Sequence, residues 1–377
     1  MAAKPRVVLL RGHHANVWDL RPWERLRDDF DVSVLVTGSN LHQISGLGIE
    51  VVPVRTPRDS LPAGRAAGAI AYAIGERYLK LEPLLRGADI VHAAELSTWF
   101  AAQAARLKGR LGFKLALTVW ETIPWRGAYR WPRERAYRRA VMDAADRYLP
   151  ATDRARRALQ LEGIAADLID LCPPGIDLEP FARAEAAPSS GRPELLSAGR
   201  LVWEKGHQDV LRALAALRGG LVGQSRGDLG LAIVGSGPEE GRLRAYANEL
   251  GLGDAVTFTP TVPYGEMPAR YASATALVLA SLPTRTWEEQ FGMVMVEALA
   301  AGTPVIAAAS GAIPEVLGGE GRLFEPGDWL GLARLLADGP LASGRAFAPA
   351  PNRTRLERYS IDAAARRYRD VYARLLA

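Results

Sequence analysis

The chain has 377 residues, of which 48% are hydrophobic and 24% are charged, so it can bury two domain cores and is not intrinsically disordered. No stretch approaches about 18 uninterrupted apolar residues, which excludes a transmembrane helix, and the VVLL run near the start is too short for a secretory signal. Cys172 is the only cysteine, so an internal disulfide is excluded and we expect a reducing, cytoplasmic setting.

The net charge of +5 is confined to the first half of the chain. Lys and Arg outnumber Asp and Glu by five over residues 1–182, whereas the two signs balance over residues 183–377. A basic half favours an anionic partner, such as a phosphorylated substrate, a membrane surface or nucleic acid. The alternative is an ordinary solvated surface that is rich in arginine.

Residues 1–183 alternate short apolar runs with helical stretches. We expect strands at Arg6–Leu10, Val32–Val36, Glu50–Val54, Asp89–Val91 and Lys114–Val119. A long helical stretch is expected around Ala66–Leu85, and another within AELSTWFAAQAARLKG. This alternation is typical of an α/β domain that is built on a parallel sheet.

The alternation resumes after Ala184–Arg192, which is rich in Ala, Pro, Ser and Gly and which we interpret as a linker. We expect strands at Leu195–Ser197, Leu229–Val234, Ala255–Phe258, Ala276–Ala280 and Pro304–Ala307, and helices at Gly206–Leu217 and Gly292–Ala301. The tail, Asp362–Leu376, has the apolar spacing of an amphipathic helix. We therefore predict domains at residues 1–183 and 184–355, followed by a terminal helical segment at 356–377.

Two such domains would place the carboxyl ends of both sheets on a shared cleft. Open parallel sheets bind their ligands at those ends, beside the N-termini of helices. We therefore expect phosphate-binding residues in the loops that lead from strands to helices.

The segment SAGRLVWEKGH, residues 197–207, follows a predicted strand and opens a helix. Gly199 lets the chain leave the strand sharply, and Arg200 and Lys205 place two cations around one turn. Such a pair can hold a diphosphate from two sides, with help from the helix dipole. The alternative is a surface arginine and lysine beside a loop glycine.

A second glycine-containing turn, VGSGPE, begins at Val234 and also connects a strand to a helix. Gly235 can let the backbone approach a ligand closely, although a plain tight turn would look the same. The turn is not a dinucleotide fingerprint, because Glu240 stands where the third glycine of G-x-G-x-x-G would be.

The segment from Ser281 to Val305 carries two carboxylates eight residues apart. Glu289 precedes a predicted helix, while Glu297 lies within it and suits bidentate hydrogen bonding to vicinal hydroxyls, as on a ribose. The first-turn amides of this helix have no partner within the helix and can meet a sugar or phosphate oxygen. These amides belong to Gly292, Met293 and Val294. The alternative is a helix with ordinary acidic residues.

These motifs together resemble the signature of the family 4 (group 1) retaining glycosyltransferases. The resemblance rests on the E-x7-E spacing with EQFG and VEALAAGTPVIA around it, and on SAGRLVWEKGH and VGSGPEEGRLR. It extends to SGAIPEVL (310–317), PPGIDLEPF (173–181) and DIVHAAELS (89–97). The likeness therefore covers nearly the whole chain.

The resemblance implies a GT-B fold, in which two Rossmann-like domains face a cleft and the C-terminal helix crosses back to the N-terminal domain. It implies that Arg200 and Lys205 hold the diphosphate of a nucleotide-sugar donor. Glu289 would meet the donor sugar and Glu297 the ribose. Further donor contacts are implied for Gly235, Val262, Phe291, Gly292, Met293 and Val294. No metal and no other cofactor are expected, because fixed cations can stabilise the leaving diphosphate, and the family proposal for retention is front-face attack.

The N-terminal half departs from the family pattern. Many members carry a glycine-rich loop after the first strand, where this chain has RGHHAN with Gly12, His13 and His14. Many also end the strand before ETIP with a histidine that contacts the donor sugar, where this chain has Trp120. We expect Glu121 to replace that histidine, and the alternatives that stay open are His92, Glu95, His13 and His14. Trp120 could stack on a sugar or belong to the core.

The segment from Arg126 to Arg139 interleaves six arginines with aromatic residues. Such a helix suits the inner face of a membrane or an anionic acceptor, or it is an ordinary solvated helix. Single-stranded nucleic acid could use the same residue types, but nothing else in the sequence supports nucleic acid as a partner.

The leading interpretation is an enzyme that transfers a sugar from a nucleotide donor to a saccharide, lipid-linked or small-molecule acceptor. A nucleotide-sugar epimerase or a phosphorylase on the same fold is one alternative, and a non-catalytic sugar-nucleotide-binding protein is another. The missing dinucleotide fingerprint disfavours an oxidoreductase.

Overall fold

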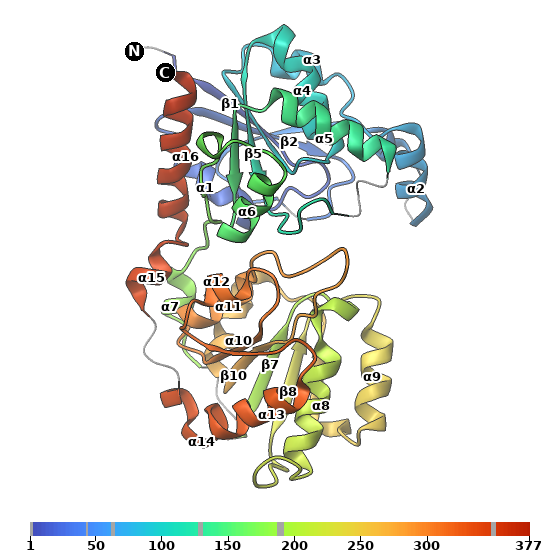
Figure 1. The fold of residues 1–377 in the computed structure, drawn as a ribbon, viewed down its shortest axis with the longest axis vertical. Helices are drawn as coiled ribbons and strands as arrows, with labels where there is room; N and C mark the ends of the chain where they lie inside the picture. Colours follow the sequence, from blue (N-terminus) through green and yellow to red (C-terminus); the bar gives the residue numbers. More distant parts are fainter. Residues whose placement is uncertain (1–2, 43, 62–64, 127–130, 187–191, 348–351) are drawn as a thin grey trace. The chain divides into compact units, whose positions relative to one another are not determined.

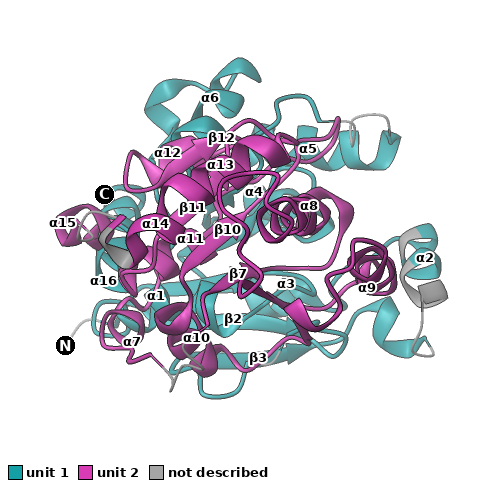
Figure 2. Cartoon of the chain, turned by 90° about the horizontal axis from the view of Figure 1, so that it is seen from below, with its two compact units in different colours: residues 1–175, 359–377 teal, residues 176–358 magenta. Residues whose placement is uncertain are grey.

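The computed structural model of the chain describes residues 3–42, 44–61, 65–126, 131–186, 192–347 and 352–377. The chain forms two compact units, which are Met1–Gly175 with Tyr359–Ala377, and Ile176–Arg358 (Figure 2). The second unit includes helix α7 (Glu179–Ala182), because Phe181 packs against Tyr264 and Tyr271 with ring centroids 5.7 and 5.8 Å apart. The division thus precedes the predicted linker, of which residues 187–191 lie outside the described residues.

The first unit is built on a parallel sheet whose described strands number six, in the order β3-β2-β1-β4-β5-β6 (Figure 1). The strands are β1 (Arg6–Leu10), β2 (Asp31–Thr37), β3 (Glu50–Val54), β4 (Ile90–Ala94), β5 (Lys114–Val119) and β6 (Arg147–Pro150). The helices are α1 (Val17–Glu24), α2 (Arg65–Ile74), α3 (Leu81–Leu85), α4 (Trp99–Leu111), α5 (Pro132–Ala144), α6 (Asp153–Leu161) and α16 (Ile361–Leu376).

The second unit repeats this topology, with six described strands in the order β12-β11-β10-β7-β8-β9 and parallel pairing throughout. The strands are β7 (Glu194–Ala198), β8 (Gly230–Val234), β9 (Val256–Thr259), β10 (Ala276–Leu279), β11 (Val305–Ala308) and β12 (Arg322–Phe324). Its helices, besides α7, are α8 (His207–Arg218), α9 (Glu240–Glu249), α10 (Met267–Ser273), α11 (Met293–Ala300), α12 (Ile313–Leu317), α13 (Trp329–Asp338), α14 (Pro340–Ser343) and α15 (Arg353–Glu357).

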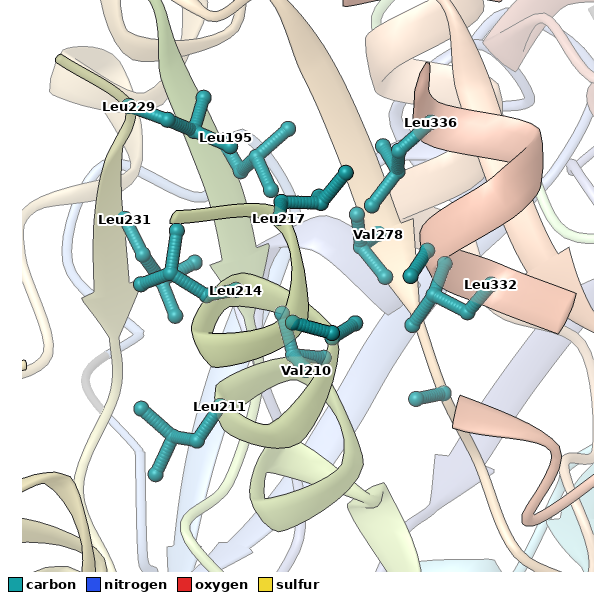
Figure 3. Close-up of a cluster of buried hydrophobic side chains, with 14 of the residues drawn as sticks. Leu195, Val210, Leu211, Leu214, Leu217, Leu229, Leu231, Val278, Leu332 and Leu336 are labelled. Atoms are coloured by element: carbon teal, nitrogen blue, oxygen red, sulfur yellow. The ribbon is translucent and has the colours of Figure 1, made fainter. Parts of the chain in front are cut away.

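Apolar runs form the central strands because helices cover both faces of each sheet. All four residues of β10, ALVL, are buried. Helix α8 presents Val210, Leu214 and Leu217 to the sheet at helical spacing, and α13 adds Leu332 and Leu336 to the same cluster (Figure 3). Each fully buried leucine contributes about 1.5–3 kcal/mol of transfer free energy. This core gives the loops at the strand ends a rigid base.

Helix α16 belongs to the first unit although it ends the chain, and it lies beside α1 (Figure 1). Ser360 caps its N-terminus by accepting a hydrogen bond from the amide of Ala363. Trp23 of α1 stacks on Tyr368 at 4.3 Å between ring centroids and donates its indole N–H to the Tyr372 hydroxyl at 2.8 Å. Buried aromatic contacts therefore fasten the C-terminal helix to the first sheet.

The sequence predicted ten of the twelve strands that the structure describes. Strands β6 and β12 were missed, because RYLP and RLF each begin with an arginine and contain no apolar run of the kind that marks the central strands. The helical stretch expected at Ala66–Leu85 is interrupted, because residues 75–78 between α2 and α3 have no regular structure and Gly75 has a φ of +88°. No helix in the described part of the chain has the length and apolar composition needed to cross a bilayer.

Gly206 precedes α8, and substitution of this glycine measures how tightly the second unit packs at its strand ends. Its φ is +70°, and a Cβ placed on it would lie 1.8 Å from the carbonyl oxygen of Ala280. Gly302 has a nearly identical φ of +69° but nothing within 4 Å of such a Cβ. We expect Gly302→Ala to lower the free energy of unfolding by about 1 kcal/mol, the cost of the left-handed conformation alone, and Gly206→Ala to lower it by more than about 3 kcal/mol.

Urea unfolding of both variants measures the difference. Equal losses of unfolding free energy in the two variants would contradict the close approach of Gly206 to Ala280.

Candidate functional site

The strand order of the second unit reverses direction between β7 and β10, which are neighbours in the sheet. The loops after these two strands therefore leave the sheet side by side, at the position where open α/β sheets bind ligands. The first loop, residues 199–206, carries Arg200 and Lys205, and the second, residues 280–292, carries Glu289. The fold brings these predicted residues to one edge of one sheet.

Lys205 and Glu289 form a largely buried ion pair between the two loops. The Lys205 Nζ lies 2.7 Å from Glu289 Oε2, and the side chains are 15% and 8% exposed. The same oxygen accepts a hydrogen bond of 2.7 Å from the hydroxyl of Ser281, which is fully buried. The Lys205 ammonium also lies 5.2 Å from the ring centroid of Trp287. Sequence reasoning missed Ser281, because a lone serine at a strand end carries no spacing signal.

Two glycines make this contact possible because they bring backbone against backbone. Gly206 approaches Ala280, as described above, and a Cβ on Gly311 would lie 2.1 Å from the carbonyl oxygen of Glu289. That oxygen accepts the amide of Ala312 at 2.8 Å. The amide of Leu282 likewise bonds the carbonyl of Glu204 in the first loop at 2.8 Å. Glu289 is thus fixed through its main chain as well as its side chain.

A buried histidine positions the backbone at Arg200. The Nδ1 of His207 lies 2.9 Å from the Ser197 hydroxyl, and its Nε2 lies 3.2 Å from the Arg200 carbonyl oxygen. Burial lowers the pKa of His207 to about 4, and the nearby Lys205 adds to the decrease. The ring is therefore neutral at pH 7, and its Nε2–H donates to Arg200. The guanidinium of Arg200 is exposed, and no described residue forms an ion pair with it.

The glycine turn after β8 packs against the first loop. A Cβ on Gly235 would lie 1.9 Å from the carbonyl oxygen of Gly199, so only glycine fits there. Val262 is half-buried in the loop after β9, and its neighbour Thr261 donates its amide to the Ser236 hydroxyl at 3.1 Å. Both predicted donor-side residues therefore lie in loops at the carboxyl ends of strands.

Helix α11 begins where the sequence predicted its donor-binding amides. Gly292 precedes it with a φ of +82°, Met293 and Val294 form its half-buried first turn, and Phe291 is buried before it. The amides of a first helical turn point away from the helix, so this terminus can accept an anion or a sugar oxygen.

Glu297 lies deeper in α11 and is 4% exposed. Its Oε1 accepts a hydrogen bond of 2.8 Å from the hydroxyl of Tyr264, and its Oε2 accepts one of 2.7 Å from Tyr271. Burial raises the pKa of Glu297, and the two hydroxyls partly offset that rise. Both tyrosines were absent from the sequence-based site, because they lie more than twenty residues away from Glu297.

In the first unit, two of the three predicted histidines, His13 and His92, are buried. His92 is fully buried, with Nδ1 2.6 Å from the Tyr372 hydroxyl and Nε2 2.8 Å from that of Thr118. Burial holds its pKa well below the ordinary value. Gly12 donates its amide to the Tyr78 hydroxyl at 2.9 Å. His92 therefore joins the sheet to α16 and is not presented to a ligand.

Glu95 and Glu121 follow the neighbouring strands β4 and β5. Glu95 has a φ of +63°, a strained value for a side-chain-bearing residue, and its Oε1 accepts the Trp120 amide at 2.8 Å. Burial raises the pKa of Glu95 to about 7, and the Glu121 carboxylate adds to that rise. The Glu121 carboxylate is itself engaged by the amides of Thr122 and Ile123 and by the Arg126 guanidinium.

Glu95, Trp120 and Glu121 therefore lie at one edge of the first sheet. The hydrogen bonds of the Glu121 carboxylate to described residues are all to the loop that follows it, so this carboxylate stabilises that loop. His13 and His14 follow β1, with His13 buried and His14 exposed. Among the described residues, no group of three or more His, Cys, Asp or Glu side chains is placed to hold a metal ion.

Two family models match the chain, and together they cover most of it. The model described as "Glycosyl transferases group 1" matches residues 179–338, and the one described as "Glycosyltransferase Family 4" matches residues 23–180. The two matches meet at α7, close to the division between the two units.

Curated relatives and solved structures extend the comparison. A D-inositol 3-phosphate glycosyltransferase of Catenulispora acidiphila is 32% identical over an alignment of 324 residues that covers 78% of this chain and 73% of that protein. A GDP-mannose-dependent phosphatidylinositol monomannoside mannosyltransferase of Mycobacterium tuberculosis is 34% identical over 244 residues, covering 59% and 60%. The crystal structure of Anabaena Alr3699/HepE with UDP covers 98% of this chain and 100% of that one, with a TM-score of 0.77 at 17% identity, and shares its fold.

The neutral His207 makes stability depend on pH in a defined direction. The unfolded chain binds a proton at this residue below about pH 6.5, while the folded protein binds it only near pH 4. Stability contributed by His207 is therefore complete above pH 6.5 and is lost as the pH falls towards 4. We expect His207→Gln to reduce the slope of unfolding free energy against pH in this window by up to about 1.4 kcal/mol per pH unit.

Urea unfolding at pH 4.5, 5.5, 6.5 and 7.5 measures this slope. His42→Gln, which changes an exposed histidine, is the matched control. Identical slopes for both variants would show that His207 does not carry the effect.

Proposed function

Because the chain belongs to the group 1, family 4 glycosyltransferases, as its motifs predicted, we propose that it moves a sugar from a nucleotide-diphosphate donor to a hydroxyl acceptor without a metal. Its predicted GT-B fold is confirmed by the two six-stranded parallel sheets of the described residues and by the likeness to Alr3699/HepE. The observation that carries the donor assignment is the Lys205–Glu289 pair at the reversal point of the second sheet.

The leaving diphosphate gains negative charge as the bond to the sugar breaks. We assign its stabilisation to Lys205, to the exposed guanidinium of Arg200 and to the first-turn amides of α11. Fixed donors of this kind stabilise a transition state because they need no reorganisation when the charge develops. His207 supports the site by holding the Arg200 main chain.

Glu289 is assigned to the donor sugar. One of its oxygens is shared by Lys205 and Ser281, which keeps the carboxylate oriented. We assign its Oε1, which accepts no hydrogen bond from a described residue, to a hydroxyl of the donor sugar. Glu297 is assigned to the ribose hydroxyls, which would compete with the Tyr264 hydroxyl for Oε1. We propose retention of anomeric configuration by front-face attack, in which the departing phosphate takes the acceptor proton.

The identity of the donor follows only from the relatives. The mycobacterial relative is named for its dependence on GDP-mannose, and Alr3699/HepE was solved with UDP and with UDP-glucose. We therefore propose a hexose carried on GDP or UDP as the donor class.

On the acceptor side we propose Glu95 as the residue that stands in for the family histidine at Trp120. Glu121, which the sequence favoured, has both carboxylate oxygens engaged by its own loop. Glu95 has one oxygen bonded to the Trp120 amide, and burial raises its pKa to about 7, so at neutral pH part of the population carries a proton that can be donated to a hydroxyl of the donor sugar.

We also propose that α5 makes a peripheral contact with an anionic membrane surface. Trp125 and Trp131 are 59% and 60% exposed. A groove of about 430 Å³ lies at this helix and is lined by Trp125, Arg135, Arg138, Arg139, Met142 and Asp143. Aromatic side chains beside arginines suit the headgroup region of a bilayer. The predicted segment from Arg126 to Arg139 includes residues 127–130, which lie outside the described residues.

Loss of the Lys205–Glu289 pair should abolish sugar transfer. Because removal of one partner leaves a buried charge unpaired, shape-preserving variants are the sharper test. We expect Lys205→Met and Glu289→Gln each to lower kcat/KM by about 100-fold or more. Release of nucleoside diphosphate from GDP-mannose and UDP-glucose, with and without saccharide acceptors and in the presence of EDTA, measures turnover.

The matched control is the Lys108–Asp146 pair of the first unit, which spans 2.8 Å against 2.7 Å in the site pair. Lys108→Met should keep normal turnover. Near-normal turnover of both site variants would refute the donor-site assignment. Conversion of the donor into an isomeric nucleotide sugar, without net release of nucleoside diphosphate, would favour an epimerase.

Membrane contact is tested by reversing charge on the exposed face of α5. Arg135→Glu combined with Arg139→Glu should weaken binding to vesicles of phosphatidylglycerol by about tenfold or more, because each basic residue contributes about 1 kcal/mol near an anionic surface. The same reversal at Arg242 and Arg244, on α9 of the second unit, should have little effect. Sedimentation with vesicles measures binding. Equal losses of vesicle binding in the α5 and α9 variants would contradict a membrane contact through α5.

A further inference from the structure

A tryptophan in the loop after β10 packs against the charged end of Lys205. The Lys205 ammonium lies over the ring of Trp287, 5.2 Å from its centroid, which is within the range at which an aromatic face attracts a cation. The same ammonium lies 2.7 Å from Glu289 Oε2. The stem of the lysine passes close to the end of β7, since a Cβ on Gly199 would lie 3.8 Å from its Cδ. Three neighbours therefore confine this one side chain.

The backbone that carries Trp287 is folded into a closed turn. The Trp287 carbonyl accepts the amide of Thr284 at 2.7 Å and the hydroxyl of the same threonine at 3.3 Å. The start of this turn is tied to the loop after β7, because Leu282 donates its amide to the carbonyl of Glu204 at 2.8 Å. Glu204 directly precedes Lys205 in the chain. Main-chain hydrogen bonds thus bring the indole ring and the lysine together.

An aromatic face and a carboxylate stabilise an ammonium in different ways. The Glu289 carboxylate neutralises the cation and accepts one of its three N–H donors. The indole ring has no net charge, so it attracts the ammonium through its quadrupole and leaves the positive charge in place. The Lys205 side chain is also only 15% exposed. A cation that is shielded from water attracts an anion more strongly, because less solvent screens the interaction.

We propose that Trp287 is a positioning residue of the donor site, which holds the Lys205 ammonium in place for the diphosphate of the donor. A lysine has a flexible four-carbon stem, and fixing that stem when a ligand binds costs rotamer entropy. A ring that fixes the stem beforehand removes this cost from the binding step. The inference rests on the proposed role of Lys205, and Trp287 acts through that lysine without a contact of its own to the diphosphate.

Two other roles of Trp287 lead to different expectations. A tryptophan that only completes the fold of its loop would support binding whether or not Lys205 is present. A tryptophan that stacks on the nucleotide would do so as well. A residue that acts through Lys205 contributes only while the ammonium is there, so a double-mutant cycle on binding distinguishes this role from the other two.

Calorimetric titration of the full chain and its variants with GDP and UDP tests the proposal. We expect Trp287→Leu to weaken binding of the tighter of these two nucleotides by about two- to thirtyfold, which corresponds to the usual strength of a cation–π contact. Trp287→Phe keeps a smaller aromatic face and should lose less affinity than Trp287→Leu. In a Lys205→Met background, Trp287→Leu should cause no further loss, because no cation remains for the ring to hold.

The matched control is another contact between a cation and an aromatic ring in the same unit. The Arg212 guanidinium of α8 lies 5.5 Å from the ring centroid of Tyr246 on α9. Tyr246→Leu removes that ring and should leave the affinity for both diphosphates unchanged. Thermal melting shows whether each variant is folded, and Trp287→Met, a second substitution without a ring, replaces Trp287→Leu if the latter does not fold.

The outcomes separate this inference from the proposed function. A loss of affinity from Trp287→Leu that is equally large with and without Lys205 would overturn the inference, because the ring would then act without the cation. Weak binding by Lys205→Met together with normal binding by Trp287→Leu would overturn the inference alone and leave the proposed function standing. Normal binding by Lys205→Met, or binding of neither diphosphate by the wild-type chain, would overturn the donor-site assignment on which both depend.

Discussion

The close backbone contact between the loops after β7 and β10 is the constraint on which the donor-side site depends. Gly206 allows the first loop to touch Ala280, and Gly311 allows the chain after β11 to touch Glu289. A Cβ at either position would push the loops apart, and the 2.7 Å contact between Lys205 and Glu289 would be lost. The glycines thus act through geometry, because they determine where two charged side chains can meet, while the leucine-rich core beneath keeps the strand ends still.

Arginines of the basic first half form ion pairs with neighbouring glutamates. The excess of +5 in the first half suggested a free basic surface, yet Arg126 is engaged by Glu121 and Arg138 by Glu162. At the strand ends of the same unit, the carboxylates of Glu95 and Glu121 accept main-chain amides. The arginine-rich sequence therefore describes one helix, α5, and does not describe the sheet edge, where two carboxylates lie.

Much of the fold and of the donor site could be predicted from the sequence. Apolar runs marked the buried strands, and short-range spacing placed Lys205 and Glu297 in the loop and helix where the structure has them. The contacts of Ser281 and Tyr271 could not be predicted, because they depend on strand order and on packing between distant segments. The site residues of the first unit were more difficult to predict. The role of Glu121 depends on which amides its carboxylate contacts, and the spacing of residues in the sequence does not determine those contacts.

The central claim is that Lys205 and Glu289 act as one unit that holds the donor, and a double-mutant cycle on nucleoside diphosphate binding tests it most directly. Calorimetric titration of GDP and UDP into the wild type, Lys205→Met, Glu289→Gln and the double variant supplies the four affinities. The account predicts strong non-additivity, with the double variant binding about as weakly as Lys205→Met alone. Additive losses, or affinities that none of the substitutions changes, would contradict it.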